Sequence, residues 1–396
     1  MGALDGIKVL EMAGIGPGPF AAMVLADMGA EVVRIDRPAG GRGLSLGDPA
    51  SDVLARSRRS LGLDLKSPEG LEVLLDLVGS ADVLLEGYRP GVAERLGFGP
   101  EVCLARNERL VFGRMTGWGQ DGPKATSAGH DLTYLATAGV TAHIEGPDGA
   151  PGIPMNLVGD FGGGGMLLAV GVLGALVERG ISGRGQVVDA AIVDGAALQM
   201  AIIYGMRAQG VWPGDRGRNV LDGGAPFYDH YRCADGRYVA VGALEPQFYA
   251  ALMAGLGLDG EDIATNQWTI PRWPEFAARL GEVFATRTRD EWAADLEPTD
   301  ACVAAVLDMD EAHAHPHMAA RGVVVEAFGV RQPAPAPRFS RTPGRPPTAP
   351  RPAGADSVAV LTDWGLDAGR VEKLVAAGAV HQPSDPVRPR SASQPS

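Results

Sequence analysis

Residues 7–36, IKVLEMAGIGPGPFAAMVLADMGAEVVRID, decide the fold because their hydrophobic period changes twice. IKVLEM and EVVRID are short apolar runs typical of buried strands, and PFAAMVLADMG between them has helical spacing and ends on Gly29. A strand, a helix and a second strand in this order favour parallel pairing. The segments SPEGLEVLLDLVG, ADVLLEG and RLVFGRM continue the alternation to about residue 115. We therefore predict an α/β fold whose large open domain is built on a mostly parallel sheet.

The rest of the chain divides by composition and pattern. YRCADGRYVAVGA is typical of a hairpin that turns at residues 234–236, and the proline-dense stretch after residue 330 is typical of extended chain. Five segments are predicted: the first part of the large domain at 1–208, a linker at 209–228, a smaller α+β domain at 229–330, a proline-rich return segment with the C-terminal part of the large domain at 331–381, and a disordered tail at 382–396.

The composition argues against several classes of protein. The chain has 396 residues, 45% of them apolar, and its formal net charge of −13 disfavours nucleic acid as a partner. Three distant cysteines imply neither a disulfide framework nor a zinc site, and His313, His315 and His317 have the spacing of a loop rather than of a helical ligand face, so no metal is predicted. Without a basic and apolar leader or a long uninterrupted apolar run, we expect a cytoplasmic protein with no membrane span.

A glycine-rich turn, GIGPGP at 14–19, follows the first predicted strand and imitates a dinucleotide-binding fingerprint. Pro17 and Pro19 remove backbone N–H groups from the helix start where a pyrophosphate would bind, so NAD and FAD are disfavoured. A different anion site is favoured by basic residues concentrated in the first hundred positions of this acidic chain; the alternative is a solvated basic face. These residues are Arg34, Arg37, Arg42, Arg56, Arg58, Arg59, Lys66, Arg89 and Arg95.

Three further motifs contain titratable residues suited to acid–base chemistry. His130 and Asp131 are adjacent in AGHDLTY, Asp160 precedes four glycines in NLVGDFGGGGM, and Glu245 follows an apolar run in GALEPQFY. Each has a local alternative, because His beside Asp is more often a capping arrangement and Glu before Pro is an ordinary helix start. The glycines are not followed by the lysine and hydroxyl residue of a Walker loop, so Asp160 needs another explanation than phosphate binding.

These motifs together resemble a known family. GYRPGVAERLG, GWGQDGP, GHDLTY, NLVGDFGGGGM, LDGGAPFYD and GALEPQFYAA are similar, in order, to segments of the α-methylacyl-CoA racemases of the family III CoA-transferase superfamily. The resemblance extends from about Gly6 to about Gly365. It implies an interlocked homodimer of two intertwined subunits, each with a large α/β and a small domain. The active site would lie between the large domain of one subunit and the small domain of the other.

The resemblance also implies roles for individual residues. His130 and Asp160 match the pair of proton-transferring residues, and Glu245 matches a carboxylate of the small domain that assists them. Coenzyme A would enter as part of the acyl-CoA substrate, so no separate cofactor is implied. The residues that fall where the family holds coenzyme A are Arg37, Leu63, Asp64, Leu65, Lys66, Gly87, Tyr88, Arg89, Arg95, Gly129, Asp131, Leu132, Thr133 and Tyr134.

The implied chemistry is racemisation of a 2-methylacyl-CoA thioester through a planar enolate. A histidine and a carboxylate each act as base in one direction and acid in the other if their pKa values lie near the working pH, and burial is expected to raise the pKa of Asp160. If residues 161–165 open a helix, the free N–H groups of Gly162 and Gly163 would stabilise the enolate oxygen. The alternative for these glycines is close packing of helices or subunits.

Three rival functions remain. In a family III CoA-transferase, the carboxylate matching Asp160 would attack the thioester and carry the acyl group as an anhydride. His130 favours the racemase, because the transferases usually have tyrosine between the glycine and aspartate of this motif. A CoA-binding protein without catalysis and a dehydrogenase are the other two. The sequence does not specify which acyl chain is used: branched fatty acyl and sterol or bile-acid side chains are both implied by the family.

Overall fold

The computed structural model describes residues 1–38, 47–212 and 215–383. The chain divides into two compact units. Unit 1 comprises residues 1–138, 155–199 and the chain from 321 onward, and unit 2 comprises 139–154 and 200–320. Unit 2 therefore includes segments that the sequence analysis placed in the large domain and the linker. Arg42 and nearly all of the predicted tail lie outside the described residues.

Unit 1 is built on a seven-stranded sheet with the order β12-β3-β2-β1-β4-β5-β6. Every pairing is parallel except that of β12 with β3, which is antiparallel. The predicted mostly parallel sheet is confirmed. The strands are β1 (Lys8–Met12), β2 (Glu31–Asp36), β3 (Arg59–Leu63), β4 (Val83–Glu86), β5 (Val111–Thr116), β6 (Val187–Ala191) and β12 (Val380–His381).

The helices of unit 1 begin with local signals that the sequence contains. In α2, Ser67 caps the first turn by accepting a hydrogen bond from the Gly70 N–H at 2.9 Å, and Pro68 occupies the first helical position. The helices are α1 (Pro17–Asp27), α2 (Pro68–Val78), α3 (Val92–Leu96), α4 (Pro100–Arg106), α5 (Asp131–Thr137), the π-helix η6 (Val158–Met166), α6 (Leu167–Ser182), α7 (Ile192–Gln199), α14 (Ser357–Asp363) and α15 (Ala368–Ala376).

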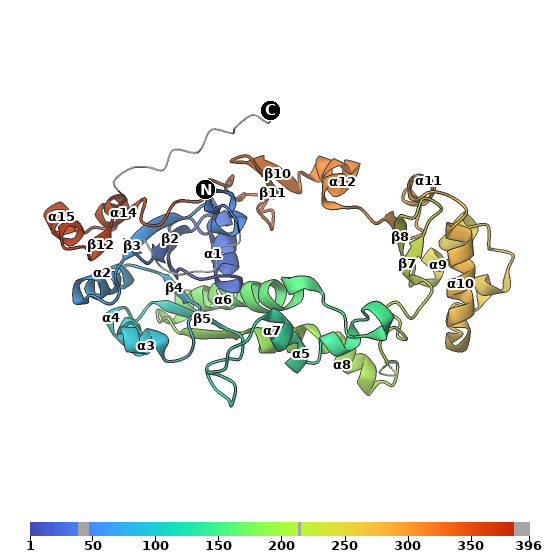
Figure 1. Cartoon of the computed structure of the whole chain (residues 1–396), viewed down its shortest axis with the longest axis horizontal. Coiled ribbons are helices and arrows are strands. Elements are labelled where there is room, and N and C mark those ends of the chain that lie inside the picture. Colours follow the sequence, from blue (N-terminus) through green and yellow to red (C-terminus); the bar gives the residue numbers. More distant parts are fainter. Residues whose placement is uncertain (39–46, 213–214, 384–396) are drawn as a thin grey trace. The chain divides into compact units, whose positions relative to one another are not determined.

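Both faces of the sheet are buried, as is usual for parallel strands. Successive strand residues point to opposite faces, so Val9 belongs to one core and Leu10 to the other. The first core packs under α1 and α6, and the second under α2, α14 and α15 (Figure 1). Continuous apolar strands between two helical layers leave the ends of the strands as the place for polar chemistry.

Unit 2 contains a three-stranded antiparallel sheet, β7-β8-β9, with its own core around Phe227 and Trp273. The predicted hairpin is confirmed: β7 and β8 are joined by a turn closed by the Cys233 N–H bonded to the Arg237 carbonyl. The elements are β7 (Tyr228–Arg232), β8 (Tyr238–Gly242), β9 (Val303–Ala305), α8 (Ala201–Ala208), α9 (Pro246–Gly255), α10 (Trp273–Phe284), α11 (Arg289–Leu296), α12 (Met309–Ala314) and α13 (Pro316–Arg321).

The segment after unit 2 leads back to unit 1. It forms the hairpin β10 (Val324–Ala327) and β11 (Val330–Pro333), then runs without helix or strand until α14. Arg345 pairs with Asp5, and the Asp356 carboxylate accepts the Ser60 N–H of β3 at 3.0 Å. Short 3₁₀ helices complete the described chain: η1 (Pro49–Ser51), η2 (Val53–Ala55), η3 (Thr141–His143), η4 (Pro147–Gly149), η5 (Met155–Leu157), η7 (Asp262–Thr265) and η8 (Ile270–Arg272).

One helix in the described ranges, Met155–Ser182, is long and apolar enough to cross a membrane by length and composition, with a mean hydropathy of 1.7. This test is weak evidence, because core helices of soluble proteins pass it as well. In unit 1 this helix contributes Leu168, Ala169 and Val172 to the core beneath the sheet.

Candidate functional site

The predicted site residues of unit 1 gather at the carboxyl ends of the parallel strands. Arg37 follows β2, Lys66 follows β3, and Gly87, Tyr88 and Arg89 follow β4. The strand order reverses here, because β1 continues to β2 on one side and lies beside β4 on the other. Open α/β sheets bind ligands at such a switch point. The fold thus places distant sequence motifs at one edge.

Asp160 is held at this edge by two hydrogen bonds, one to the motif that contains His130 and one within its own motif. Its backbone N–H donates to Asp131 Oδ1 at 2.8 Å, and Asn156 Nδ2 donates to Asp160 Oδ2 at 3.2 Å. Gly16, in the turn after β1, lies close enough that a Cβ there would be 3.6 Å from Asp160 Oδ2. Asn156 therefore orients the carboxylate, Asp131 fixes the backbone, and Gly16 leaves room beside the carboxylate. Neither Asn156 nor Gly16 was predicted as a site residue. The i, i+4 spacing of Asn156 and Asp160 could have indicated their contact, because residues four apart are neighbours on a helix.

The pKa of the Asp160 carboxyl is raised, first by burial and then by the negative charge of Asp131. The hydrogen bond from Asn156 and the charge of His130 act in the opposite direction. The predicted direction of this shift is confirmed. A carboxyl group that keeps its proton to higher pH is suited to donate a proton as well as to accept one.

His130 immediately precedes α5. Its backbone N–H donates to Thr133 Oγ1 at 3.1 Å, and the Thr133 hydroxyl donates back to the His130 carbonyl at 2.7 Å. These bonds fix the backbone of His130 while the residue stays exposed. The next residue, Asp131, accepts the Asp160 N–H at 2.8 Å, and the charge of His130 lowers the pKa of Asp160, so the two residues lie near each other. The structure thus brings together the histidine and the aspartate of two motifs 30 residues apart.

Tyr134 packs beneath this site. Its ring lies so close to Gly117 that a Cβ there would be 2.0 Å from Cζ, and Trp118 meets it edge-on with centroids 4.8 Å apart. Burial raises the pKa of Tyr134, with a further contribution from Asp160, and Arg89 opposes the shift. Tyr134 therefore interacts electrostatically with both Asp160 and Arg89, the second of which belongs to the predicted CoA site. The motif GWGQDGP supplies the small residue that makes room for this ring.

The basic residues separate into two groups. Arg34 pairs with Asp36 at 2.8 Å, Arg58 pairs with Glu11 at 2.6 Å, Arg56 with Asp27 at 2.5 Å, and Arg59 with Glu31 and Asp363. Arg56 and Arg58 are buried, so these arginines neutralise internal carboxylates. The sequence analysis did not assign Arg56, Arg58 or Arg59 individually; the structure gives all three a structural partner.

In contrast, four exposed basic residues form no ion pair within the part of the chain that the structure describes. These are the basic residues that the family resemblance predicts to bind coenzyme A: Arg37, Lys66, Arg89 and Arg95. Arg37 lies close enough to Tyr88 to oppose the rise that burial causes in the pKa of its hydroxyl. Unpaired cations at the edge of a sheet attract anionic ligands. This arrangement suits the phosphates of a nucleotide-containing substrate.

The other predicted CoA-binding residues differ in burial and in hydrogen-bond partners. Leu63 is buried at the end of β3, and Leu65 packs against the same core, so their side chains belong to the interior. Asp64 Oδ1 accepts the Lys66 N–H at 3.0 Å. The Asp131 carboxylate is half-buried and accepts the N–H of Asp160. Gly129, Leu132 and Thr133 surround His130 at the start of α5.

The premise for an oxyanion site at Gly162 and Gly163 is wrong. The helix begins at Val158, so these glycines lie inside η6 rather than in its first turn. A Cβ on Gly163 would lie 2.8 Å from Ala196 N of α7, and one on Gly165 would lie 2.7 Å from the Pro17 carbonyl. The glycine run therefore allows η6 to pack tightly between α1 and α7. That was the alternative stated for it.

Glu245 lies in unit 2, where it precedes the first residue of α9, Pro246. It is exposed, and its charge contributes to the raised pKa of Cys302. His313 and His317 also lie in unit 2, in α12 and α13, with His315 between the helices. The expectation of a loop at these histidines is wrong for two of them. Among the described residues, no group of three or more His, Cys, Asp or Glu could hold a metal ion.

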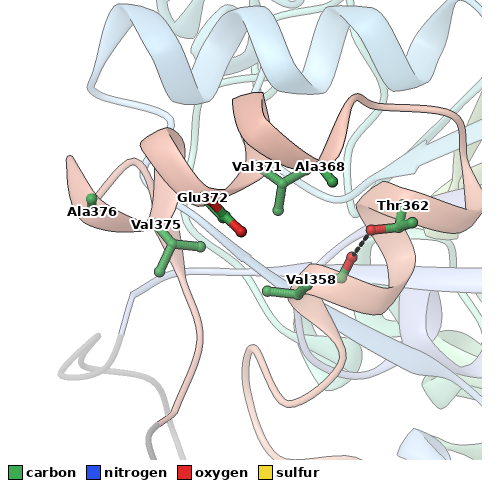
Figure 2. Close-up of a pocket in the computed structure, with 7 residues that line it drawn as sticks. All are labelled: Val358, Thr362, Ala368, Val371, Glu372, Val375 and Ala376. Atoms are coloured by element: carbon green, nitrogen blue, oxygen red, sulfur yellow. Dashed lines mark hydrogen bonds between the residues drawn. The ribbon is translucent and has the colours of Figure 1, made fainter.

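A surface pocket of about 340 Å³ lies elsewhere in unit 1, between α14 and α15. Figure 2 shows Val358, Val371 and Val375 gathered between the two helices, with Thr362 Oγ1 bonded to the Val358 carbonyl. Glu372 is its one charged residue. None of the predicted site residues lines it, and its acidic, apolar lining does not suit a phosphate.

Comparison with known proteins agrees with this geometry. The family model CoA-transferase family III matches residues 4–357. Alpha-methylacyl-CoA racemases from Mus musculus and Homo sapiens are 44% and 43% identical, each alignment covering 94% of this chain and 96% of the relative. The crystal structure of a CaiB/BaiF family protein from Brucella suis superimposes with a TM-score of 0.79 at 25% identity, over 92% of this chain and 99% of that chain. The resemblance seen in the motifs is confirmed, and the chain belongs to CoA-transferase family III.

Proposed function

We propose that this protein is an α-methylacyl-CoA racemase, which interconverts (2R)- and (2S)-2-methylacyl-CoA thioesters by moving the α-proton. The observation that carries the proposal is the proximity of His130 to Asp160, whose pKa burial raises, beside exposed cations that form no ion pair among the described residues. The similarity to racemases over nearly the whole chain supports it. The acyl-CoA is both substrate and product, and no separate cofactor takes part.

The two acid–base residues act on opposite faces of the α-carbon. One group removes the proton and leaves a planar enolate, and the other delivers a proton to the opposite face. Starting from one enantiomer, a neutral His130 accepts the proton and a protonated Asp160 donates its own; the other enantiomer uses the reverse assignment. The raised pKa of Asp160 supports this role, because an aspartate with an ordinary pKa is almost fully deprotonated near neutral pH and could not donate a proton.

The enolate oxygen needs hydrogen-bond donors, and the start of α5 supplies them in this proposal. Backbone N–H groups in the first turn of a helix have no intrahelical acceptor and lie at its positive end. In α5 these are the groups of Asp131 and Leu132, directly after His130. Glu245 assists from the small domain by favouring the charged or correctly oriented form of His130. This last role follows from motif matching alone.

We also propose a homodimer. The exposed side of η6 and α6 presents Met166, Val170, Val177 and Ile181 at helical spacing, with relative exposures of 44%, 63%, 70% and 87%. A continuous apolar stripe of this kind is typical of a surface that binds another subunit. Sedimentation at several protein concentrations tests it, and a monomer at micromolar concentration would contradict it.

Deuterium uptake tests the racemase directly. A single enantiomer of a 2-methylacyl-CoA is incubated with the protein in D₂O without any free acid. The expected result is deuterium at C2 together with loss of optical purity. His130→Ala and Asp160→Ala are expected to slow the exchange by about 10²- to 10⁴-fold while coenzyme A still binds.

A CoA-transferase is the second candidate, favoured by the description of the family itself. In that reaction Asp160 attacks the thioester carbonyl, CoA leaves as the thiolate, and an acyl anhydride forms on the carboxylate. Transfer of CoA to an added carboxylic acid, with no deuterium at C2, would establish this function and exclude the first.

A further inference from the structure

Arg114 on β5 lies between carboxylates contributed by both neighbouring strands. In the sheet register it stands beside Glu86 of β4 on one side and Asp189 of β6 on the other. Its Nε donates to Glu86 Oε1 at 2.8 Å, and the two side chains are 8% and 0% exposed. A buried arginine with an equally buried carboxylate is costly to desolvate, so it calls for a role beyond packing.

The same pair extends into two segments of the predicted CoA site. The second oxygen of Glu86, Oε2, accepts the N–H of Tyr88 at 2.7 Å, which fixes the loop that contains Arg89. Arg114 Nη1 donates to Glu94 Oε1 at 2.8 Å, and Nη2 donates to Oε2 at 3.4 Å. Glu94 lies in α3, one residue before Arg95. One guanidinium therefore joins the loop after β4 to the helix that follows it.

The apolar side of these segments is packed as well: Ala93 is buried in the core, and Tyr88 meets Phe98 edge-on with ring centroids 6.2 Å apart. Their charged side faces solvent. Gly87 and Arg89 are exposed, and α3 is a helix of five residues whose flanking Gly91 and Gly97 have positive φ. The cations themselves form no ion pair among the described residues, and within those residues Arg114 is the one ionic link between the end of β4 and α3. This link therefore contributes to the separation of Arg89 and Arg95. A displacement of about 1 Å in a ligand-holding group is enough to cost a large factor in binding or rate.

We propose that Arg114 is a positioning residue for substrate binding: through Glu86 and Glu94 it sets the spacing of Arg89 and Arg95, which then hold the phosphates of coenzyme A. The inference rests on the proposed function for the ligand, but not on which reaction follows. Arg114 itself touches no substrate in this scheme. It acts on affinity for the CoA moiety rather than on proton transfer.

The experiment measures binding of free coenzyme A to the full-length protein by calorimetry. The variants are Arg114→Met, Arg89→Ala and the double variant, with Arg179→Met as the matched control. Arg179 is also a buried arginine of unit 1, paired with Asp82 at 2.9 Å, but Asp82 precedes β4 and so lies at the opposite edge of the sheet. It tests whether any lost buried arginine weakens binding.

Arg114→Met is expected to weaken coenzyme A binding by about tenfold. Arg179→Met is expected to leave the Kd unchanged. In the double variant the two losses are expected to be far less than additive, because Arg114 acts through Arg89. In the exchange reaction KM should rise with kcat little changed, a split that general destabilisation does not produce.

Two further variants keep the test decisive if Arg114→Met does not fold. Arg114→Lys keeps the charge but not the forked geometry, and Glu94→Gln alters a side chain that is 44% exposed and removes only the link to α3. Both should weaken binding less than a folded Arg114→Met. Wild-type affinity in both variants would overturn the proposal, as would equal losses in Arg114→Met and Arg179→Met.

Failure of this inference differs from failure of the proposed function. A wild-type protein that binds coenzyme A but exchanges no α-proton contradicts the racemase and leaves the test of Arg114 intact. A wild-type protein that racemises normally, with Arg114→Met unaltered in Kd and KM, contradicts the role of Arg114 alone.

Discussion

Asp131 Oδ1 accepts the backbone N–H of Asp160 at 2.8 Å, so the residue beside one predicted acid–base group anchors the other. The bond joins the start of α5 to η6, and it places His130 and Asp160 on two elements that are tied together. The hydrogen bond between the Asp131 carboxylate and the Asp160 N–H therefore restrains the separation of His130 and Asp160. This matters for a reaction that requires a group on each side of one carbon.

Loss of either acid–base group should slow turnover strongly while coenzyme A binding persists. His130→Ala and Asp160→Ala are each expected to lower kcat by about 10²- to 10⁴-fold, the contribution of one positioned acid or base. The Kd of coenzyme A, measured by calorimetry, should stay close to that of the wild type. Comparable loss of affinity in both variants would show that these residues hold the ligand instead.

Asp160→Asn should stabilise the protein in a pH-dependent way. Burial raises the pKa of Asp160 in the folded state, so the folded protein binds this proton more tightly than the unfolded chain does. The contribution of this proton to the free energy of unfolding is fully present below the pKa of the unfolded chain, near 3.8. It is lost as the pH rises through the higher pKa that Asp160 has in the folded protein.

The melting temperature of Asp160→Asn should therefore exceed that of the wild type at neutral pH, with a gap that shrinks toward acidic pH. Thermal unfolding followed by circular dichroism across this range checks it. If the difference in melting temperature grew on acidification, the surroundings would stabilise the charged Asp160 carboxylate instead of destabilising it.

Arg37→Met should weaken coenzyme A binding by about tenfold, because a hydrogen-bonded cation–phosphate contact is lost. The dependence of the Kd on salt should also become shallower. Arg59→Met is the control, since Arg59 pairs with Glu31 and Asp363 and should not contribute. Equal effects of the two substitutions would indicate a general loss of positive charge instead of a specific site.

The glycine run should be intolerant of side chains for reasons of packing. Gly163→Ala places a Cβ 2.8 Å from the backbone of α7 and is expected to destabilise folding by about 1–3 kcal/mol. Gly180→Ala, in the same continuous helix with no atom within 4 Å, should be neutral or slightly stabilising. Denaturant unfolding of both variants compares them. Equal stability of the two would show that η6 and α7 can separate without cost.

The sequence by itself determined the local elements and the kind of chemistry. The period of the apolar residues between 7 and 36, with Pro and Gly at the helix ends, specified β1, α1 and β2, because side-chain spacing follows directly from backbone geometry. Ser67 and the hairpin around Gly236 were equally local signals. The motifs identified His130, Asp160 and the exposed arginines as candidates.

Tertiary structure alone decided how these candidates are used. Which arginines are paired inside the protein and which remain exposed depends on strands brought together across the sheet, and no local pattern distinguishes Arg58 from Arg89. The glycine run was misjudged because its meaning depends on the approach of α7, more than 25 residues later in the chain. Contacts such as Asp131 with Asp160 and Arg114 with Glu86 arise from packing between distant segments, and burial, which sets the pKa of a carboxyl, exists only once that packing has formed.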